Sequence, residues 1–435
     1  MEQAQNPERM ERIKSGARQA RAASRRLAAT DADARNNAIR AAARILAARE
    51  QELLEANAAD CEESKDLPSA AYQRLKVDET KLKEIVRGLE AVAALPDPLG
   101  KVKLRRLLDE GLELTQVTCP LGVLAIIFES RPDAAPQIGS LAIKSGNAVL
   151  LKGGREAQRT NRVLVEALRD GLAEAGLPKD AVQLLEGRED VDALLALDEY
   201  VDLVIPRGSS ALVRYIQSHT KIPVMGHAEG ICHVYVDKEA DATTAVQIVR
   251  DAKAQYPAVC NAAETLLIHA SASNLLPALA ESLREAGVEL RGCPRARAIV
   301  DMNAAADEDW DTEYGELILS VKIVDSLEDA ITHIHAHGSG HTEAIVTENS
   351  ETAERFLKEV DAAGVYHNAS TRFADGYRYG FGAEVGISTG KLHARGPVGL
   401  EGLLSTKYLL RGHGHRVADY AGKDAKPFLH RDLDF

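Results

Sequence analysis

The feature of this sequence that most constrains its fold is a series of short apolar runs separated by segments with helical periodicity. The run VLAIIF at residues 123–128 is apolar at every position and lies between Gly122 and the polar segment ESRP. This pattern is typical of a strand buried on both faces. Helical patterns and apolar runs alternate up to residue 240, and again from 265 to 368. Two alternating series predict two doubly wound α/β domains with mostly parallel sheets.

Short strands and longer helices make up both series. The expected strands cover residues 112–119, 123–128, 148–151, 182–185, 201–205, 223–225, 232–236, 265–268, 298–300, 318–324, 344–346, 364–368 and 405–410. The expected helices cover residues 136–144, 157–175, 190–197, 209–218, 241–254, 274–285, 326–335 and 350–360. In sheets of this kind, ligands bind at the carboxyl ends of the strands.

The N-terminal quarter has helical periodicity without apolar strand runs. Residues 6–58 predict two amphipathic helices that break near Thr30, where Asp31 is placed to cap the second. Residues 70–95 predict a further helix, which ends at the breaker cluster PDPLG. We expect these helices to cover one face of a sheet. Because 435 residues exceed the usual size of one domain, two or three domains are expected.

Charge and cysteine content exclude several functions. The formal net charge of −13 opposes binding to a phosphate backbone, so we expect no nucleic-acid partner. The sequence has neither a signal-peptide pattern nor an apolar run of about 20 residues, so we expect no membrane contact. The five cysteines show no CxxC and no zinc-type spacing. This predicts reduced thiols, a cytoplasmic protein and no bound metal.

Cys260 lies on an expected loop between the helical pattern at 241–254 and the apolar run at 265–268. A thiol on such a loop can be held rigidly and still be reached by a substrate, and a cysteine thiolate is a strong nucleophile near neutral pH. The alternative is a small apolar residue that fills a gap in the core, which is common for an isolated free cysteine.

Two junctions between a strand and the following helix combine glycine with basic or hydroxyl residues. These are KGGR at 152–155 and PRGSS at 206–210, in which Gly208 and Ser209 would offer backbone N–H groups. Such junctions suit the phosphates of a nucleotide, although helix capping alone favours the same residues. The GxGxxG dinucleotide fingerprint is absent.

The stretch from 368 to 397 is long, Gly-rich and polar, and long loops in compact domains are more often functional than idle. Its Arg372 and Arg395 have the geometry to hold carboxylate or phosphate oxygens in bidentate fashion. The alternative for both arginines is ordinary surface charge.

Six motifs form a set along the chain. They are FESRPD at 128–133, KSGNA at 144–148, LVIPRG at 203–208, VCN at 259–261, ETLL at 264–267 and NASTRF at 368–373. The set resembles that of the γ-glutamyl phosphate reductases, or glutamate-5-semialdehyde dehydrogenases, of the aldehyde dehydrogenase superfamily. The domains implied by this resemblance are a cofactor-binding domain at 1–110 and 120–240, a catalytic domain at 241–395, and oligomerisation strands and tail at 111–119 and 396–435.

The resemblance implies NADPH-dependent reduction of L-γ-glutamyl 5-phosphate to L-glutamate 5-semialdehyde in proline biosynthesis. Cys260 would attack the acyl phosphate and expel phosphate, and the thioester would then accept hydride. The developing oxyanion needs donors; the backbone N–H of Cys260 is the expected first donor and Asn261 the second. Glutamate 5-kinase is an expected partner for substrate handover. Pairing of residues 112–119 with 405–410 across subunits would give a dimer or tetramer.

By the same resemblance, Lys152 contacts the adenosine ribose of the cofactor and Glu313 contacts the nicotinamide ribose. NAD-preferring relatives often carry a Glu shortly after the lysine, so we expect Arg155 to accept the 2′-phosphate of NADP(H). Gly208 and Ser209 complete the expected cofactor-binding residues. The residues expected to hold the phosphate and α-carboxylate of the substrate are Arg131, Arg372 and Arg395.

Two other functions stay open. The first is a hydrolytic aldehyde dehydrogenase of the same superfamily. The missing Asn near Glu129 counts against it, and we do not take Glu229 as the base that would activate water. The second is a non-catalytic assembly protein on this fold, against which the retained Cys260 and its flanking residues count.

Overall fold

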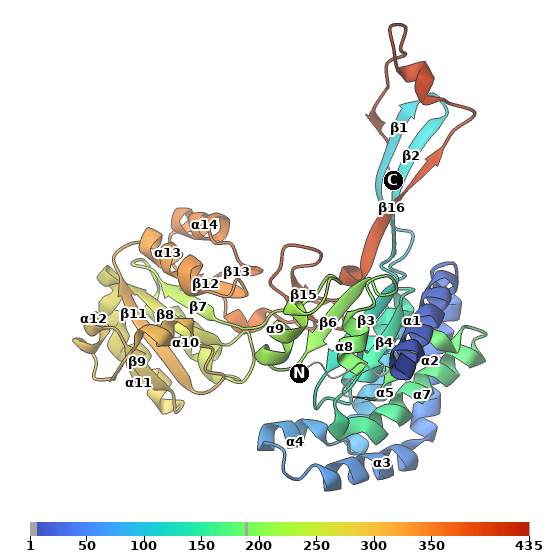
Figure 1. Ribbon diagram of the computed structural model, residues 1–435. Helices are drawn as coiled ribbons and strands as arrows, with labels where there is room; N and C mark the ends of the chain where they lie inside the picture. The colour runs from blue at the N-terminus through green and yellow to red at the C-terminus, as the bar shows by residue number, and fades with distance from the viewer. Residues whose placement is uncertain (1–6, 188–189, 435) are drawn as a thin grey trace.

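The computed structural model describes residues 7–187 and 190–434. Two parallel sheets with their helices form the two lobes of the body, and an antiparallel arm projects from it (Figure 1). The expected doubly wound α/β architecture is therefore present. Residue 6 of the first expected helix lies outside the described residues. Among the described residues, no helix has both the length and the apolar character needed to cross a membrane.

From residue 7 on, where the structure describes it, the N-terminal quarter forms five helices rather than the three expected. They are α1 (Pro7–Ala28), α2 (Ala32–Ala48), α3 (Glu50–Glu63), α4 (Ser69–Leu75) and α5 (Glu79–Ala94). Asp31 caps α2 as predicted, since its carboxylate accepts from a backbone N–H of the first turn at 2.7 Å. The expected second helix is interrupted at Arg49, and the helix expected at 70–95 is broken before Asp78, which caps α5.

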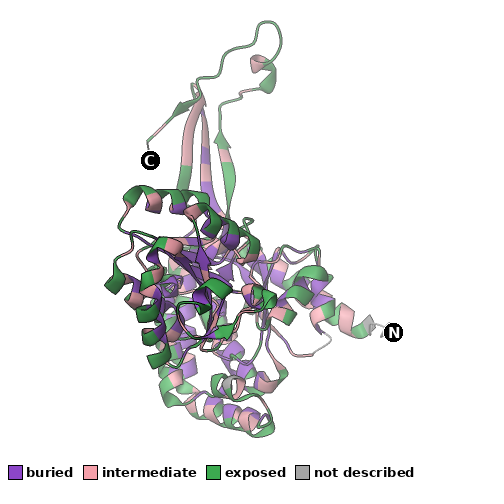
Figure 2. Cartoon of the chain, turned by 90° about the vertical axis from the view of Figure 1, so that its left-hand side faces the viewer, coloured by how far each residue is buried: buried purple, intermediate pink, exposed green. Residues whose placement is uncertain are grey.

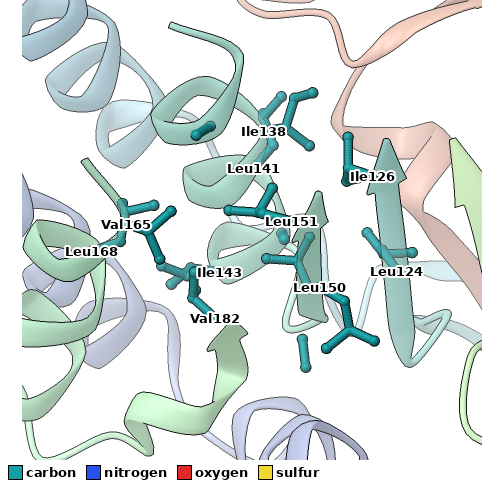
Figure 3. Packing of buried hydrophobic residues seen from close by; sticks show 14 of the residues in the cluster. Leu124, Ile126, Ile138, Leu141, Ile143, Leu150, Leu151, Val165, Leu168 and Val182 are labelled. Carbon is teal, nitrogen blue, oxygen red and sulfur yellow. The ribbon is translucent and has the colours of Figure 1, made fainter. Parts of the chain in front are cut away.

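The first parallel sheet has the strand order β5-β4-β3-β6. Its elements are β3 (Val123–Phe128), α6 (Ala134–Lys144), β4 (Ala148–Lys152), α7 (Gln158–Glu174), β5 (Val182–Leu185), α8 (Asp190–Leu195), β6 (Leu203–Arg207) and α9 (Ser210–Ser218). Leu124 of β3 and Leu150 of β4 belong to one buried cluster with Leu141 of α6 and Leu168 of α7 (Figure 3). The strand expected at 223–225 is reduced to a single bridge to β6.

The second parallel sheet has the order β10-β9-β11-β8-β7-β12-β13. Its strands are β7 (Cys232–Val236), β8 (Ala263–His269), β9 (Glu289–Gly292), β10 (Asn303–Ala304), β11 (Ile318–Val324), β12 (Thr342–Val346) and β13 (Gly364–His367). Its helices are α10 (Ala242–Ala254), α11 (Leu276–Glu285), α12 (Pro294–Arg297), α13 (Leu327–His337) and α14 (Ser350–Glu359). The strand expected at 298–300 is wrong, because α12 ends at Arg297 and a turn follows it over that segment.

Alternate residues of β7 enter different cores, as the period of a strand requires. Val234 and Val236 belong to the cluster that α10 and α11 cover. Tyr235 belongs to the cluster that α13 and α14 cover, and its ring stacks on Phe356 with centroids 6.4 Å apart. Helices therefore lie on both faces of this sheet, and its central strands β7, β8 and β12 are buried along almost their whole length.

The arm is an antiparallel sheet of order β16-β2-β1-β17. Its strands are β1 (Val102–Asp109), β2 (Leu112–Pro120), β16 (Leu404–Arg411) and β17 (Arg431–Asp432). β16 pairs with β2 within one chain, so the expected pairing of these strands across subunits is wrong. Figure 2 shows the arm as largely exposed or half-buried. The expected domain limits stay a proposal. We assign residues 102–109 to the arm rather than to the cofactor-binding domain, because β1 pairs with β2.

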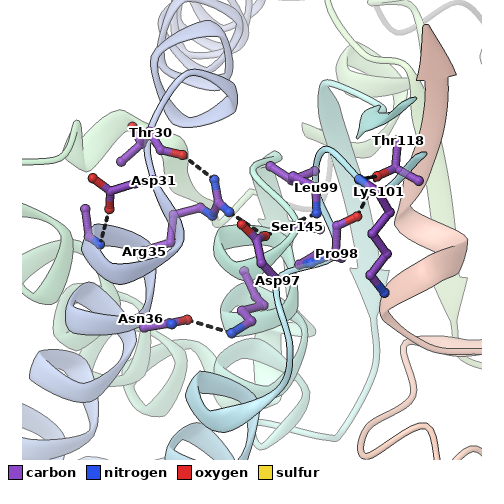
Figure 4. A network of polar contacts seen from close by, with 12 residues as sticks. Thr30, Asp31, Arg35, Asn36, Asp97, Pro98, Leu99, Lys101, Thr118 and Ser145 are labelled. Atoms are coloured by element: carbon purple, nitrogen blue, oxygen red, sulfur yellow. Dashed lines mark hydrogen bonds and ion pairs between the residues drawn. The ribbon is translucent and has the colours of Figure 1, made fainter. Parts of the chain in front are cut away.

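A polar network joins the N-terminal helices to the segment that leads into the arm (Figure 4). Arg35 is 1% exposed and donates to the carbonyl oxygen of Thr30 at 2.5 Å and to Asp97 Oδ1 at 2.6 Å. The same Asp97 oxygen accepts from the backbone N–H of Leu99 at 3.1 Å. Because a buried guanidinium needs partners, the contact between Arg35 and Asp97 fixes the path of the chain before β1.

Candidate active site

Cys260 lies on the loop between α10 and β8, as the sequence predicted, and it is a half-buried free thiol. A buried ion pair ties together the two elements that flank this loop. Lys253, in the last turn of α10, places its Nζ 2.5 Å from Oε2 of Glu264 on β8. Neither side chain is more than 1% exposed. Cys260 is therefore held between two elements that this ion pair joins.

The segment before β7 packs directly on the backbone of Cys260. A Cβ atom added to Gly230 would lie 2.1 Å from the carbonyl oxygen of Cys260, so no side chain fits there. The thiol of Cys232 donates to the same carbonyl oxygen at 3.3 Å. This close contact brings His227 of the GHAEG segment into the site.

Two imidazoles accompany the thiol. The ligand atoms of His227, Cys260 and His341 all lie within 4.8 Å of one another. Ligands of a tetrahedral zinc ion lie roughly 3.3–3.8 Å apart, given Zn–N distances of about 2.0 Å and Zn–S distances of about 2.3 Å. A common limit of 4.8 Å is wider than that range, so these separations alone do not define a zinc site, and we assign no metal ion to the group.

The charges around the thiol oppose its ionisation. Burial raises the pKa of Cys260 to about 12, and the carboxylates of Glu313 and Glu384 add to the rise. Arg207 acts in the opposite direction and lowers the pKa of the thiol. The resting side chain is therefore a thiol at neutral pH, and it needs a proton acceptor before it can attack a carbonyl carbon.

The structure brings three arginines into this electrostatic environment. Arg372 is 7% exposed, its Nε donates to Gln255 Oε1 at 3.0 Å, and its charge acts on Cys260. The charge of Arg207 also acts on Cys260, and its guanidinium lies 3.9 Å from Glu384. Arg131 is exposed, and its charge acts on both Arg207 and Glu384. The positive charges of these three arginines together favour an anionic substrate near the thiol.

Arg395 forms an ion pair with Asp361. It donates to Asp361 Oδ1 at 2.8 Å, and Lys391 contacts the second oxygen of the same carboxylate. These hydrogen bonds lower the pKa of Asp361 to about 2. This ion pair fixes the loop before β15 (Gly396–Val398), and the expected contact of Arg395 with substrate stays a prediction.

Asn261 holds a neighbouring loop. Its Nδ2 donates to the carbonyl oxygen of Ala374 at 2.8 Å in a buried contact, and its Oδ1 is buried without a hydrogen-bond partner. One amide hydrogen is therefore already engaged. Asn261 supports the segment that carries Arg372, and its second amide hydrogen leaves its expected role as an oxyanion donor, beside the backbone N–H of Cys260, as a prediction.

Four of the expected cofactor residues, Lys152, Arg155, Gly208 and Ser209, lie at or just after the carboxyl ends of β4 and β6 in the first sheet. Glu129, Lys152 and Gly208 each lie at or just after the carboxyl end of neighbouring parallel strands β3, β4 and β6. Lys152 is buried, which lowers the pKa of its ammonium, and it donates to the carbonyl oxygen of Gly153 at 2.5 Å. Ser209 caps α9, and its backbone N–H donates to Glu129 at 3.1 Å.

The two charged residues that follow Lys152, Arg155 and Glu156, differ in exposure and in hydrogen bonding. Arg155 is exposed, whereas Glu156 is held by Ser130, whose backbone N–H and hydroxyl donate to it at 2.6 and 2.9 Å. The acidic side chain is therefore engaged and the basic one is open to a ligand. In the second domain, Glu313 lies before β11, and its charge acts on Cys260.

Sequence reasoning missed four residues near the thiol, which are Arg207, His227, His341 and Glu384. Their only sequence signals are glycine-rich neighbours, in PRG, GHAEG, HGSGH and GAE. Such neighbours mark loops but do not say which loops meet.

The two parallel sheets and the cysteine on the loop between α10 and β8 are to be compared with known families, and one family model matches most of the chain. Residues 5–318 match the family described as the aldehyde dehydrogenase family. An acetylating aldehyde dehydrogenase from Geobacillus thermoglucosidasius has the same fold, with a TM-score of 0.65 at 16% identity over 94% of this chain and 98% of that one.

Closer similarity narrows the family. A γ-glutamyl phosphate reductase from Cyanothece sp. is 58% identical over 96% of this chain and 97% of its own length. The crystal structure of a γ-glutamyl phosphate reductase from Thermotoga maritima has a TM-score of 0.91 at 40% identity, covering 93% of this chain and 99% of that one. This chain therefore belongs to the γ-glutamyl phosphate reductases within the aldehyde dehydrogenase family.

Proposed function

We propose that this protein reduces L-γ-glutamyl 5-phosphate to L-glutamate 5-semialdehyde, releases phosphate and uses NADPH, as a step of proline biosynthesis. The observation that carries the proposal is Cys260 on a loop bordered by Arg207 and Arg372. The names and near-complete coverage of the similar proteins support the same reaction.

The acyl-transfer step uses residues of this chain. The thiolate of Cys260 attacks the γ-carbonyl carbon, and the bond from that carbon to the phosphate oxygen breaks. Arg131, Arg207 and Arg372 are the proposed partners of the substrate's phosphate and α-carboxylate, because guanidinium groups bind such oxygens in bidentate fashion. The backbone N–H of Cys260 is the proposed donor to the oxyanion.

The residues at the edge of the first sheet suit a nicotinamide dinucleotide. NADPH supplies hydride to the acyl carbon when it is bound. Lys152, Gly208 and Ser209 are its proposed contacts in the first domain, and Glu313 is the proposed contact in the second. The exposed guanidinium of Arg155, beside a glutamate already held by Ser130, supports a preference for the 2′-phosphate of NADPH.

The alternative of a hydrolytic aldehyde dehydrogenase requires a base that activates water. Glu229, the acidic residue of the GHAEG segment, is paired with Arg214. This contact disfavours hydrolysis. Oxidation of glutamate 5-semialdehyde with NADP⁺ separates the two functions, because a reductase of this kind needs added phosphate for turnover and a hydrolase does not.

Assembly and location are further parts of the proposal. The edge strand β16 exposes Tyr408 and Leu410, at 63% and 58%, which suits a homo-oligomer built through the arm. The five free cysteines suit the reducing cytoplasm. We also propose glutamate 5-kinase as the supplier of the unstable acyl phosphate. Activity with γ-glutamyl phosphate and NADPH tests the function, and absence of NADPH consumption would contradict it.

A further inference from the structure

The thiol of Cys260 has two histidine neighbours that none of the roles above uses. His227 is half-buried and His341 is fully buried. Their rings are nearly perpendicular, at 78°, with centroids 4.9 Å apart, and both present a ring nitrogen within 4.8 Å of the Cys260 sulfur. They come from the segment before β7 and the start of β12, which lie side by side in the second sheet.

The hydrogen bond of His227 fixes its tautomer. Its Nδ1 lies 2.8 Å from the carbonyl oxygen of Ile387, on β14 (Gly386–Ser388). A carbonyl oxygen only accepts, so Nδ1 carries the hydrogen. Burial, aided by the positive charge of Arg207, lowers the pKa of His227 and keeps the imidazole neutral. Its Nε2 therefore has a free lone pair.

His341 is placed to hold that ring. Its Nδ1 lies 2.8 Å from the hydroxyl of Thr342, and its Nε2 is buried without a hydrogen-bond partner. Burial lowers the pKa of His341 to about 3, so it adds no positive charge. A neutral ring packed edge-on against His227 restricts the orientation of that imidazole, and one of its nitrogens lies within 4.8 Å of the Cys260 sulfur.

We propose that His227 is a catalytic residue whose Nε2 accepts the proton of the Cys260 thiol, and that His341 is the positioning residue that holds the imidazole in place. The charged groups that face this pair are Arg207, Glu313 and Glu384. Since the two carboxylates and burial suppress free ionisation, the proton leaves the sulfur as attack occurs, which is general base catalysis.

The proton balance of the step closes without another reactant. The S–H bond of Cys260 breaks and an N–H bond forms at Nε2 of His227 as the sulfur bonds to the acyl carbon. The carbon–oxygen bond to phosphate then breaks, and the departing phosphate takes the proton from Nε2. His227 is neutral again, and the acyl group is a thioester.

Alkylation of Cys260 by iodoacetamide tests this role without substrate or cofactor, so its outcome is independent of the proposed reductase function. The informative variant is His227→Asn, because the asparagine amide can still donate to Ile387 but has no Nε2. The matched control is His219→Gln, since exposed His219 also bonds a backbone carbonyl through Nδ1, that of Tyr215 at 2.8 Å. Mass spectrometry of the peptide that carries Cys260 follows the reaction from pH 6 to 10.

We expect alkylation at pH 7 to fall about 100-fold in His227→Asn, the usual scale of general base catalysis, and to recover at high pH, where the thiol ionises unaided. His341→Gln should give a smaller loss, and His219→Gln should match the wild type. Loss of folding in His227→Asn would show as faster alkylation than in the wild type, because an exposed cysteine has a pKa of about 8.5, and His227→Gln then repeats the measurement. Wild-type rates in both His227 variants at pH 7 would overturn the proposal. So would Glu313→Gln reproducing the pH-dependent loss, because Glu313 would then be the base.

Discussion

Replacement of Lys253 by Met removes one partner of a buried ion pair and keeps most of its apolar volume. The Lys253 ammonium and the Glu264 carboxylate lie 2.5 Å apart, at 0% and 1% exposure. Burial raises the pKa of Glu264 to about 7 although Lys253 pulls it down. Breaking a buried pair typically costs about 3–5 kcal/mol, so we expect that loss in the free energy of unfolding at pH 7.

The same variant has a defined pH dependence. Without Lys253, the pKa of Glu264 rises further, while in the unfolded chain it lies near 4.3. The folded state therefore keeps a proton that the unfolded state releases. Stability is greatest below pH 4.5 and falls as the pH rises through the folded pKa, by up to about 1.4 kcal/mol per pH unit.

Urea unfolding followed by tryptophan fluorescence measures both effects. The single tryptophan, Trp310, lies in the same domain as the pair. The double variant Lys253→Met/Glu264→Leu is the control, because it removes the unpaired carboxyl and should recover most of the stability and lose the pH dependence. A single variant as stable as the wild type would refute the reasoning, and so would a double variant no better than the single one.

Other predictions follow from single contacts. Arg155→Glu should lower the NADPH over NADH preference in kcat/KM by about 10-fold or more, the scale of a lost charge-assisted hydrogen bond; an unchanged ratio would remove Arg155 from the 2′-phosphate site. Arg372→Ala should raise KM for γ-glutamyl phosphate about 10-fold or more, whereas Arg395→Ala, which only breaks the pair with Asp361, should change KM less than about 3-fold. If Arg395→Ala matches Arg372→Ala, Arg395 also binds the substrate. Leu410→Asp on the edge of β16 should shift the protein toward monomer in light scattering, and an unchanged mass would exclude that edge from the interface.

Local patterns predicted much of the fold. The all-apolar run of β3 and the Asp31 cap of α2 are visible in the sequence because each depends on adjacent residues. β1 was missed because its KLRRLL segment shows no alternation, and its pairing with β2 and the distant β17 forms the strand. The AIV segment at 298–300 has strand composition, yet it follows the proline-initiated helix α12 and turns instead.

The site was predictable only in part. Cys260 was found because a helix, a loop and a strand surround it in the sequence. His227 and His341 are separated by more than a hundred positions, and only the adjacency of β7 and β12 brings them together. Arg395 and Arg372 are alike as features of the sequence. Only the structure shows that Arg395 forms an ion pair with Asp361. Contacts between residues that are distant in the sequence cannot be predicted from local patterns.

The most direct test of the central claim is a burst experiment with glutamate 5-semialdehyde and NADP⁺ in the absence of phosphate. A thioester on Cys260 predicts rapid formation of one NADPH per active site, then a halt, with one glutamyl group on the peptide that carries Cys260. Added phosphate should restart turnover, and Cys260→Ser should give no burst. A burst with full turnover in Cys260→Ser, or an unacylated Cys260 in the wild type, would contradict the account.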